Sequence, residues 1–519
     1  QLFERPTVEA LAEAVEEARL AASDGRVLRI ERAEGATGQG IALSFAQQRL
    51  WFLDQLEPDS GFYNIPVALR LEGHLDVSAL EASLNEIIRR HESLRTRFET
   101  VAGEPVQVVS GEWQLRLEVE DVNSVEVEKL ADAEARKGFD LSAGPLLRVK
   151  LLRLTDEEHV LLLTMHHIIS DGWSMGILVR EVAALYEAQR TGIEANLPEL
   201  PVQYADYAVW QRAYLSGETL TKQLDYWTQQ LAGAPALIEL PTDRPRPEEQ
   251  THRGAQQGVA LSVGLSEELR TLSRREGVTL YMTLLAAFDV LLHHYTRGED
   301  IVVGTDVANR NHVEIEGLIG FFVNQLAMRV QLTGDPTFRE LLQRVRKTSL
   351  EAYAHQEIPF DRLVDALGLE RSLKFSPLFQ VKLILQNTPA AELEVPGLRL
   401  SNVEIDRGTS QLDLNLRLTE FEQAIHGSAE YSTDLFDGAT ITRLLRGFET
   451  LLEEAVKRPD ARVSELVASL ADAAQQQKNA RERELKQSIS HKLKNRRRAA
   501  ASPQGGRDAS TEEAAALIV

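Results

Sequence analysis

The chain has 519 residues, of which 43% are apolar and 26% are charged, a composition typical of a globular protein too long for one ordinary core. Its net charge of −22 argues against nucleic-acid binding, and the absence of cysteine excludes disulfides, a thiolate nucleophile and cysteine-ligated zinc. No apolar run approaches the ~20 residues that span a bilayer and no signal peptide opens the chain, so we expect a cytoplasmic location.

The first 40 residues are expected to precede the first folded lobe. The chain begins with Gln1 instead of Met, so we expect it to be part of a longer protein. Residues 1–18 carry apolar side chains at helical spacing, which predicts an amphipathic helix. Residues 19–40 are rich in glycine and are interpreted as a linker.

Two regions that mix strands and helices follow, at 41–215 and 216–468. In the first region, apolar periodicity predicts strands at 66–71, 145–154 and 159–165, and helices at 77–91 and 173–190. In the second region, it predicts strands at 257–263, 300–304, 377–386, 412–418 and 424–431, and helices at 279–295 and 439–456. Strands and helices do not alternate regularly, so the pattern favours the α+β class, with two lobes around a cleft.

The C-terminal residues 469–519 differ in composition from both lobes. They are locally basic between 478 and 498, and poor in apolar side chains between 499 and 510. We interpret this tail as a solvated linker, with a docking element for another polypeptide as the alternative.

The strongest chemical signal is a His-His-x-x-x-Asp-Gly motif formed by His166, His167, Asp171 and Gly172. It stands where the predicted strand 159–165 gives way to the predicted helix 173–190, which is a place from which side chains reach a cleft. Neighbouring residues of an extended chain point to opposite sides, so we expect only one of the two imidazoles to act in catalysis.

This motif is one of seven ordered segments that resemble the condensation domain of a non-ribosomal peptide synthetase. The resemblance covers about residues 41–468, and residues 371–376 depart from the family pattern. The segments are 44–53 (Ser-Phe-Ala-Gln-Gln-Arg-Leu-Trp-Phe-Leu), 90–98, 165–174, 204–210, 319–324, 355–361 and 377–380.

The resemblance implies two chloramphenicol-acetyltransferase-like lobes in a V around a tunnel. A donor carrier protein would bring an acyl or peptidyl thioester to one mouth, and an acceptor carrier would bring an aminoacyl thioester to the other, each on phosphopantetheine. The amine would attack the donor carbonyl and form an amide. No cofactor or metal of the domain's own is implied. Residues 1–18 are similar to the last helix of an upstream carrier domain, which indicates an elongating domain, and the motifs resemble those that join an L-donor to an L-acceptor.

The resemblance nominates His167 as the catalytic residue. An imidazole is mostly neutral at pH 7 and can take the proton that the attacking amine releases, although positioning of the two substrates contributes as much or more. His166 is expected to be structural, and Gly172 to serve the turn and leave room for the acyl group.

Two roles are open for Asp171: it orients His167, or it pairs with a cation and holds the loop. The second is favoured because Arg90 and Arg95, in a matching segment, offer bidentate partners. Four further residues are expected to line the tunnel, although capping of the next helix is an alternative for the two serines. They are Ser170, Trp173, Ser174 and Asn324.

Three other functions share this fold or motif. An epimerisation domain would need an added acidic residue to reprotonate an α-carbon. A stand-alone acyltransferase would use coenzyme A, and a non-catalytic carrier-docking domain would have lost the motif. No Gly-x-Ser-x-Gly elbow, phosphate-binding loop or metal-ligand spacing is found in the sequence.

Overall fold

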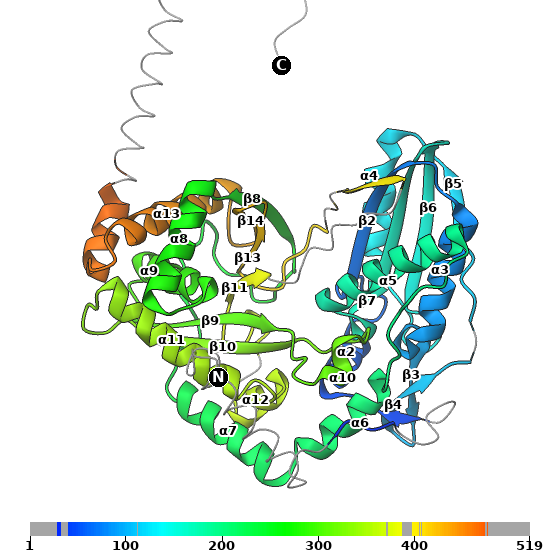
Figure 1. The fold of residues 1–519 in the computed structure, drawn as a ribbon. Helices are drawn as coiled ribbons and strands as arrows, with labels where there is room; N and C mark the ends of the chain where they lie inside the picture. Colours follow the sequence, from blue (N-terminus) through cyan, green and yellow to red (C-terminus); the bar gives the residue numbers. More distant parts are fainter. Residues whose placement is uncertain are drawn as a thin grey trace, which may run out of the picture.

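The computed structural model describes residues 29–32, 40–111, 113–369, 372–386, 397–403, 405, 407–472 and 475. The predicted helix 1–18, most of the linker 19–40 and most of the tail 469–519 lie outside these ranges. The described residues form two lobes that stand side by side and are joined at the base of the view by α6 (Tyr204–Tyr214) and α7 (Gly217–Leu231) (Figure 1).

The N-terminal lobe is built on a five-stranded sheet in the order β12-β2-β7-β6-β5. Helices α3 and α5 pack on one face of this sheet, and α4 packs on the other. The strands are β2 (Asn64–Gly73), β5 (Glu118–Asp121), β6 (Leu147–Thr155), β7 (Glu158–His166) and β12 (Leu398–Asn402), and the helices are α2 (Phe45–Leu56), α3 (Val77–Arg90), α4 (Ser124–Arg136) and α5 (Gly172–Thr191).

A small three-stranded sheet, β1-β4-β3, completes this lobe, together with two 3₁₀ turns. Its strands are β1 (Ile41–Ala42), β3 (Thr96–Val101) and β4 (Glu104–Val109), and the turns are η1 (Glu92–Arg95) and η2 (His167–Ile169).

The C-terminal lobe is built on a six-stranded sheet in the order β10-β9-β11-β13-β14-β8, in which β11 runs parallel to its neighbours β9 and β13. Gly304 of β9 is required here, because a Cβ at this position would lie 2.3 Å from the Phe379 ring. The strands are β8 (Gly254–Ala260), β9 (Asp300–Val307), β10 (Asn324–Gln331), β11 (Val381–Gln386), β13 (Leu414–Phe421) and β14 (Ala424–Ser432).

Helix α9 (Leu280–Thr296) is the central helix of this lobe, and its apolar side chains are almost all buried, as its sequence predicts. Leu470, beyond the predicted lobe boundary at 468, is buried in the same core. The other helices of the lobe are α8 (Val263–Glu276), α10 (Val313–Glu316), α11 (Phe338–Ala354), α12 (Phe360–Ala366) and α13 (Gly438–Lys457).

Strand β12 shows that the lobes are not contiguous in sequence. It lies within the range expected for the second lobe, yet it pairs antiparallel with β2 of the first, with Leu400 opposite Leu71. An open sheet edge exposes unpaired backbone groups, and the added strand covers the edge of β2.

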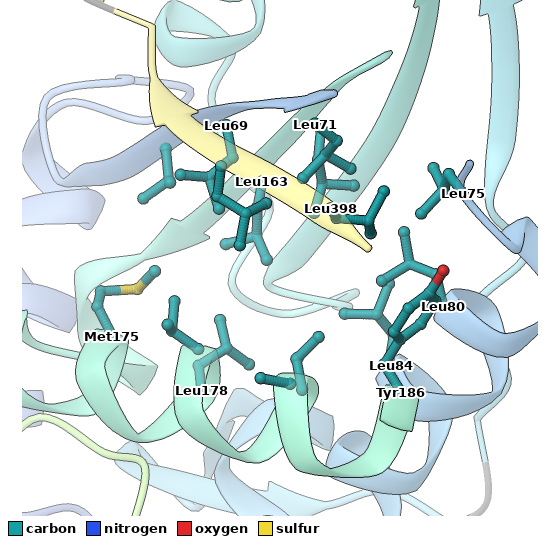
Figure 2. A pocket seen from close by; sticks show the side chains of 16 residues that line it. Leu69, Leu71, Leu75, Leu80, Leu84, Leu163, Met175, Leu178, Tyr186 and Leu398 are labelled. Atoms are coloured by element: carbon teal, nitrogen blue, oxygen red, sulfur yellow. The ribbon is translucent and has the colours of Figure 1, made fainter. Parts of the chain in front are cut away.

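An apolar cavity of about 70 Å³ lies beneath β12, between the sheet and helices α3 and α5 (Figure 2). Leu69, Leu163 and Leu398 cover it from the sheet side, and Met175 and Leu178 line it from α5. The core of the first lobe is therefore incompletely filled at this edge.

Among the described helices, none is by itself both long and apolar enough to cross a membrane. Helices α8 and α9 together pass that test on length and composition alone, and they are bent by 103° to each other.

Candidate active site

The histidine motif occupies the junction of β7, the turn η2 and helix α5, as predicted. Strand β7 ends at His166, and η2 begins at His167. Asp171 is the N-cap of α5, and its side chain accepts a hydrogen bond from the backbone N–H of Ser174 at 2.8 Å. The two imidazoles have different surroundings.

His166 is buried and serves the structure. Its Nδ1 accepts a hydrogen bond from the backbone N–H of Ile168 at 3.1 Å, and its ring lies against Phe139. Burial, with smaller contributions from His167 and the positive charge of Arg148, lowers the pKa of His166 to about 3. The ring is therefore neutral at any physiological pH.

His167 is partly exposed and lines a cavity of about 170 Å³ between the two lobes. Its Nδ1 is buried and makes no hydrogen bond to another described residue, and its ring meets Phe321 edge-on at 4.9 Å. Because Nδ1 is buried, Nε2 is the ring nitrogen that a substrate in the cavity could reach.

The charge state of His167 is set mainly by burial, which lowers its pKa below the ordinary value. The positive charge of Arg407 acts in the same direction. Asp171 and Asp306 oppose this shift with their negative charges. The net result is an imidazole that is neutral at pH 7 and able to accept a proton.

Both lobes contribute to the cavity, which is only partly enclosed. Arg49 and Tyr63 line it from the first lobe beside His167, and Asn324, Asp306 and Arg407 line it from the second. A substrate in this cavity would therefore contact both lobes at once.

Asp171 pairs with a cation, as favoured from the sequence, but the predicted partners Arg90 and Arg95 are wrong. Its Oδ1 lies 3.2 Å from Nη2 of Arg310, which comes from the second lobe, and both side chains are buried. Its Oδ2 accepts a hydrogen bond from the backbone N–H of Phe322 at 3.0 Å. Asp171 therefore ties the motif to the other lobe.

Arg90 and Arg95 support the motif only indirectly. Arg90 pairs with Glu181 of α5 at 3.1 Å, and the same carboxylate lies 2.9 Å from Nε2 of His91. Arg95 donates to the carbonyl oxygen of Ser110 at 2.6 Å. Their guanidinium groups are thus committed to other partners, which explains why Asp171 pairs elsewhere.

Three of the predicted tunnel residues lie outside the cavity. Ser170 is fully buried, and Ser174 donates its hydroxyl to Asp171 at 2.7 Å and receives a hydrogen bond from Arg310 at 2.8 Å. Trp173 donates its indole N–H to the carbonyl of Glu316 at 3.1 Å. The N-cap of α5 is Asp171, so neither serine caps this helix.

Gly172 and Asn324 are placed partly as expected. A Cβ on Gly172 would meet only the side-chain amide of Gln386, at 3.8 Å, so there is open space beside it, but its backbone conformation does not require glycine. Asn324 lines the cavity and uses its amide to hold the segment before α12, with hydrogen bonds to Gln356, Ile358 and Phe360.

Sequence reasoning missed Arg310, Arg407 and the ion pair between Lys382 and Asp306, whose atoms are 2.9 Å apart. None of these residues belongs to a short sequence motif that indicates a chemical role. Each is brought to the site by the fold, from a position far from the histidine motif in the sequence. In the described part of the chain, no group of three or more metal-ligating side chains is assembled.

Comparisons with known proteins agree with this geometry. Residues 38–478 match the family model described as the condensation domain. A linear gramicidin synthase of Brevibacillus parabrevis is 50% identical over 474 residues, which are 90% of this chain and 9% of that protein. Phosphinothricin tripeptide synthetase PhsB of Streptomyces viridochromogenes is 41% identical over 89% of this chain and 40% of its own length.

Solved structures share the fold as well. The crystal structure of the X-domain from teicoplanin biosynthesis has a TM-score of 0.77 and 32% identity, and the alignment covers 84% of this chain and 99% of that one. The chain spans less than a tenth of the length of the gramicidin synthases that it matches.

Proposed function

Because the chain belongs to the condensation-domain family, whose members are amide-forming acyltransferases, we propose that it joins a donor acyl or peptidyl thioester to the amine of an acceptor aminoacyl thioester. The observation that carries this proposal is the partly exposed, neutral imidazole of His167 in a cavity lined by both lobes.

The proposed reaction begins when the amine nitrogen bonds to the donor carbonyl carbon and the π electrons move to the oxygen. Nε2 of His167 takes the proton that the nitrogen loses. The carbonyl then re-forms, the carbon–sulfur bond breaks, and the thiolate leaves and takes the proton from the imidazolium. His167 ends the cycle neutral.

Positioning is the other contribution that we assign to the chain's own residues. The lobes are held together around the cavity by Asp171 and Arg310, so the two substrates would meet in one defined place. An amine whose pKa is near 8 is partly neutral at pH 7 already, so alignment and proton removal after attack matter more than prior deprotonation.

Carrier proteins are the partners that we propose, one on each side of the cavity, each delivering its thioester on phosphopantetheine. The relatives are peptide synthetases much longer than this chain, which supports neighbouring domains of that kind. We also propose the elongating subtype that joins an L-donor to an L-acceptor, on the strength of the opening and histidine motifs.

A single-turnover assay with both carriers loaded tests the proposal. We expect His167→Ala to lower the amide-forming rate by about 10²- to 10⁴-fold without abolishing it. His74→Ala, which removes an exposed histidine, is the matched control and should react like wild type. An unchanged rate in His167→Ala would refute the assignment.

A second function is worth testing because the cavity contains an acidic side chain, Asp306, whose charge acts on His167. An epimerase would need such a group to protonate an α-carbon. The carboxylate of Asp306 is engaged by Lys382 at 2.9 Å, so it is held in an ion pair and is not directed at a substrate, which argues against this second function. Incubation of an L-aminoacyl carrier in heavy water discriminates, because only an epimerase exchanges the α-hydrogen.

A further inference from the structure

Arg407 is held at the junction of the lobes by the segment that leads from β12 to β13. Four residues before it, the backbone N–H of Val403 donates to Ala68 of β2, in the first lobe, at 2.9 Å. Directly after it, the carbonyl of Gly408 accepts a hydrogen bond from Gly254 of β8, in the second lobe, also at 2.9 Å. The segment is thus anchored to both lobes, and the Arg407 side chain lines the same cavity as His167.

The guanidinium of Arg407 has no counterion within salt-bridge distance and no hydrogen-bond acceptor among the described residues. The surroundings nevertheless bury most of it, and this burial lowers its pKa. The nearby charge of Arg417 acts in the same direction, and the negative charge of Glu430, which also lines the cavity, opposes it. Arginine remains charged in proteins under these conditions. A largely buried cation without a partner is costly, so its presence beside a reactive imidazole calls for an explanation.

The other cations that line the cavity are accounted for. Arg49 lies 3.4 Å from Asp361, and Lys382 lies 2.9 Å from Asp306. Arg417 is exposed and can be hydrated. Among the cations that line the cavity, Arg407 is therefore the one that is largely buried and still has N–H groups without an acceptor. An oxygen atom of a substrate bound in the cavity could accept hydrogen bonds from these groups.

Building on the proposed function, we infer that Arg407 binds the donor carbonyl oxygen and stabilises the negative charge that this oxygen gains when the amine attacks. In that step the nitrogen–carbon bond forms, the carbonyl π pair moves to the oxygen facing Arg407, and the proton leaves the nitrogen for His167. When the carbonyl re-forms, the pair returns, the carbon–sulfur bond breaks and the thiolate receives the proton. A donor aimed at a developing oxyanion in a partly enclosed site acts mainly on the transition state.

The test compares Arg407→Met, which keeps the length of the side chain but removes its charge, with Arg407→Lys. Carriers loaded with uncharged amino acids are used in single-turnover assays. We expect Arg407→Met to lower the amide-forming rate by about 100-fold, with the concentration of loaded carrier needed for half-maximal rate nearly unchanged, and Arg407→Lys to recover part of the loss.

The pH dependence of the amide-forming rate is a second measurement, and it should not change if Arg407 has only a structural role. Without the positive charge of Arg407, the pKa of His167 is set by burial and by the opposing charges of Asp171 and Asp306. The acidic limb of the rate profile should therefore shift to higher pH in Arg407→Met. Arg399→Met, eight residues upstream and exposed on β12, is the matched control.

Two results would overturn the inference. One is a wild-type rate in Arg407→Met while His167→Ala is impaired, which would leave the proposed function intact. The other is a loss that appears only when a carrier loaded with glutamate is assayed in addition, with full rates for the uncharged substrates, which would make Arg407 a selectivity residue. If Arg407→Met fails to fold, Arg407→Gln replaces it as the uncharged variant, and a full rate with an unshifted pH profile in a folded Arg407→Gln protein would also contradict the inference.

Discussion

At the scale of single residues, the ion pair between Asp171 and Arg310 carries the most weight, because both side chains are buried and they come from different lobes. Asp171→Asn would leave Arg310 buried and uncompensated. We expect the free energy of unfolding to fall by about 3–5 kcal/mol and the amide-forming activity to fall with it. Urea denaturation of the variant and of wild type measures the change.

The double variant Asp171→Asn/Arg310→Met is the control for this prediction. Removing both charges should cost less stability than removing the carboxylate alone, since no unpaired ion remains. An Asp171→Asn protein that melts like wild type but is inactive would instead support a role in orienting His167.

His166 predicts a specific dependence of stability on pH. The pKa of His166 is about 3 in the folded state and near 6.5 in the unfolded state, so protonation at low pH favours the unfolded chain. The stability that comes from keeping this ring neutral is therefore fully present above pH 6.5, and the free energy of unfolding falls as the pH drops from 6.5 toward 3. Between pH 6 and pH 4 this loss amounts to about 1.4 kcal/mol per pH unit. His166→Asn keeps an acceptor for the N–H of Ile168 and should remove this part of the slope.

Urea denaturation at pH 6, 5 and 4 checks this, with His74→Asn as the same change at an exposed site. If wild type and both variants lose stability in parallel as the pH falls, His166 is not held neutral by the fold.

The roles of single residues could be predicted from the sequence only for residues within the histidine motif. The strand-to-helix junction and the opposite surroundings of His166 and His167 follow from local pattern alone. The pairing of Asp171 with a cation was also predictable, but its partner was not. Arg310 lies outside every recognised segment, and only the approach of the two lobes brings it to Asp171.

At the scale of elements, the apolar strands and helices were predictable to within a few residues. Strand 159–165 is observed as β7, and helix 279–295 as α9. Strand β12 was missed because it is short, has exposed or only partly buried side chains, and is paired with a strand from the other end of the chain. A local pattern of five residues does not reveal such a partner.

The cavity beneath β12 leads to a stability prediction for α5. Val182 lines this cavity, and Val182→Ile adds one methylene group directed at unfilled space. We expect the free energy of unfolding to rise by about 0.8 kcal/mol, from the burial of that group. Val125→Ile on α4, where the side chain is 86% exposed, is the matched control and should change little. Destabilisation by Val182→Ile would mean that the space is not available.

At the scale of the whole molecule, the lobes are held together by segments that cross between them. The segment around Ile319 belongs to the second lobe by sequence, but Ile319 is buried in the core of the first. Tyr204 donates its hydroxyl to the carbonyl of Phe321 at 2.6 Å and so adds another tie. These residues lie in the recognised segments 204–210 and 319–324, but the contacts themselves could not be predicted from the sequence, because each depends on how the two lobes meet.

Residues 29–32 of the expected linker also contribute to the contact between the two lobes. Ile30 is 5% exposed and packs in a cluster that includes Tyr207 from the first lobe and Leu318 from the second. Next to it, Arg32 pairs with Glu92 at 2.7 Å and with Asp206 at 3.3 Å. This segment precedes the first lobe, so its docking fixes where any domain upstream of it is tethered.

Ile30→Asp is expected to release this segment from the junction. An aspartate in the apolar cluster forfeits about 1.5–3 kcal/mol of burial, so tryptic cleavage after Arg32 should become roughly ten- to a hundredfold faster, because the protease acts on the undocked state. Val125→Asp makes a similar change at an exposed site and should leave this cleavage rate unaltered. Equal cleavage rates in Ile30→Asp and wild type would show that Ile30 does not hold the segment, and an upstream carrier domain would then be tethered only from Ile41, where β1 begins.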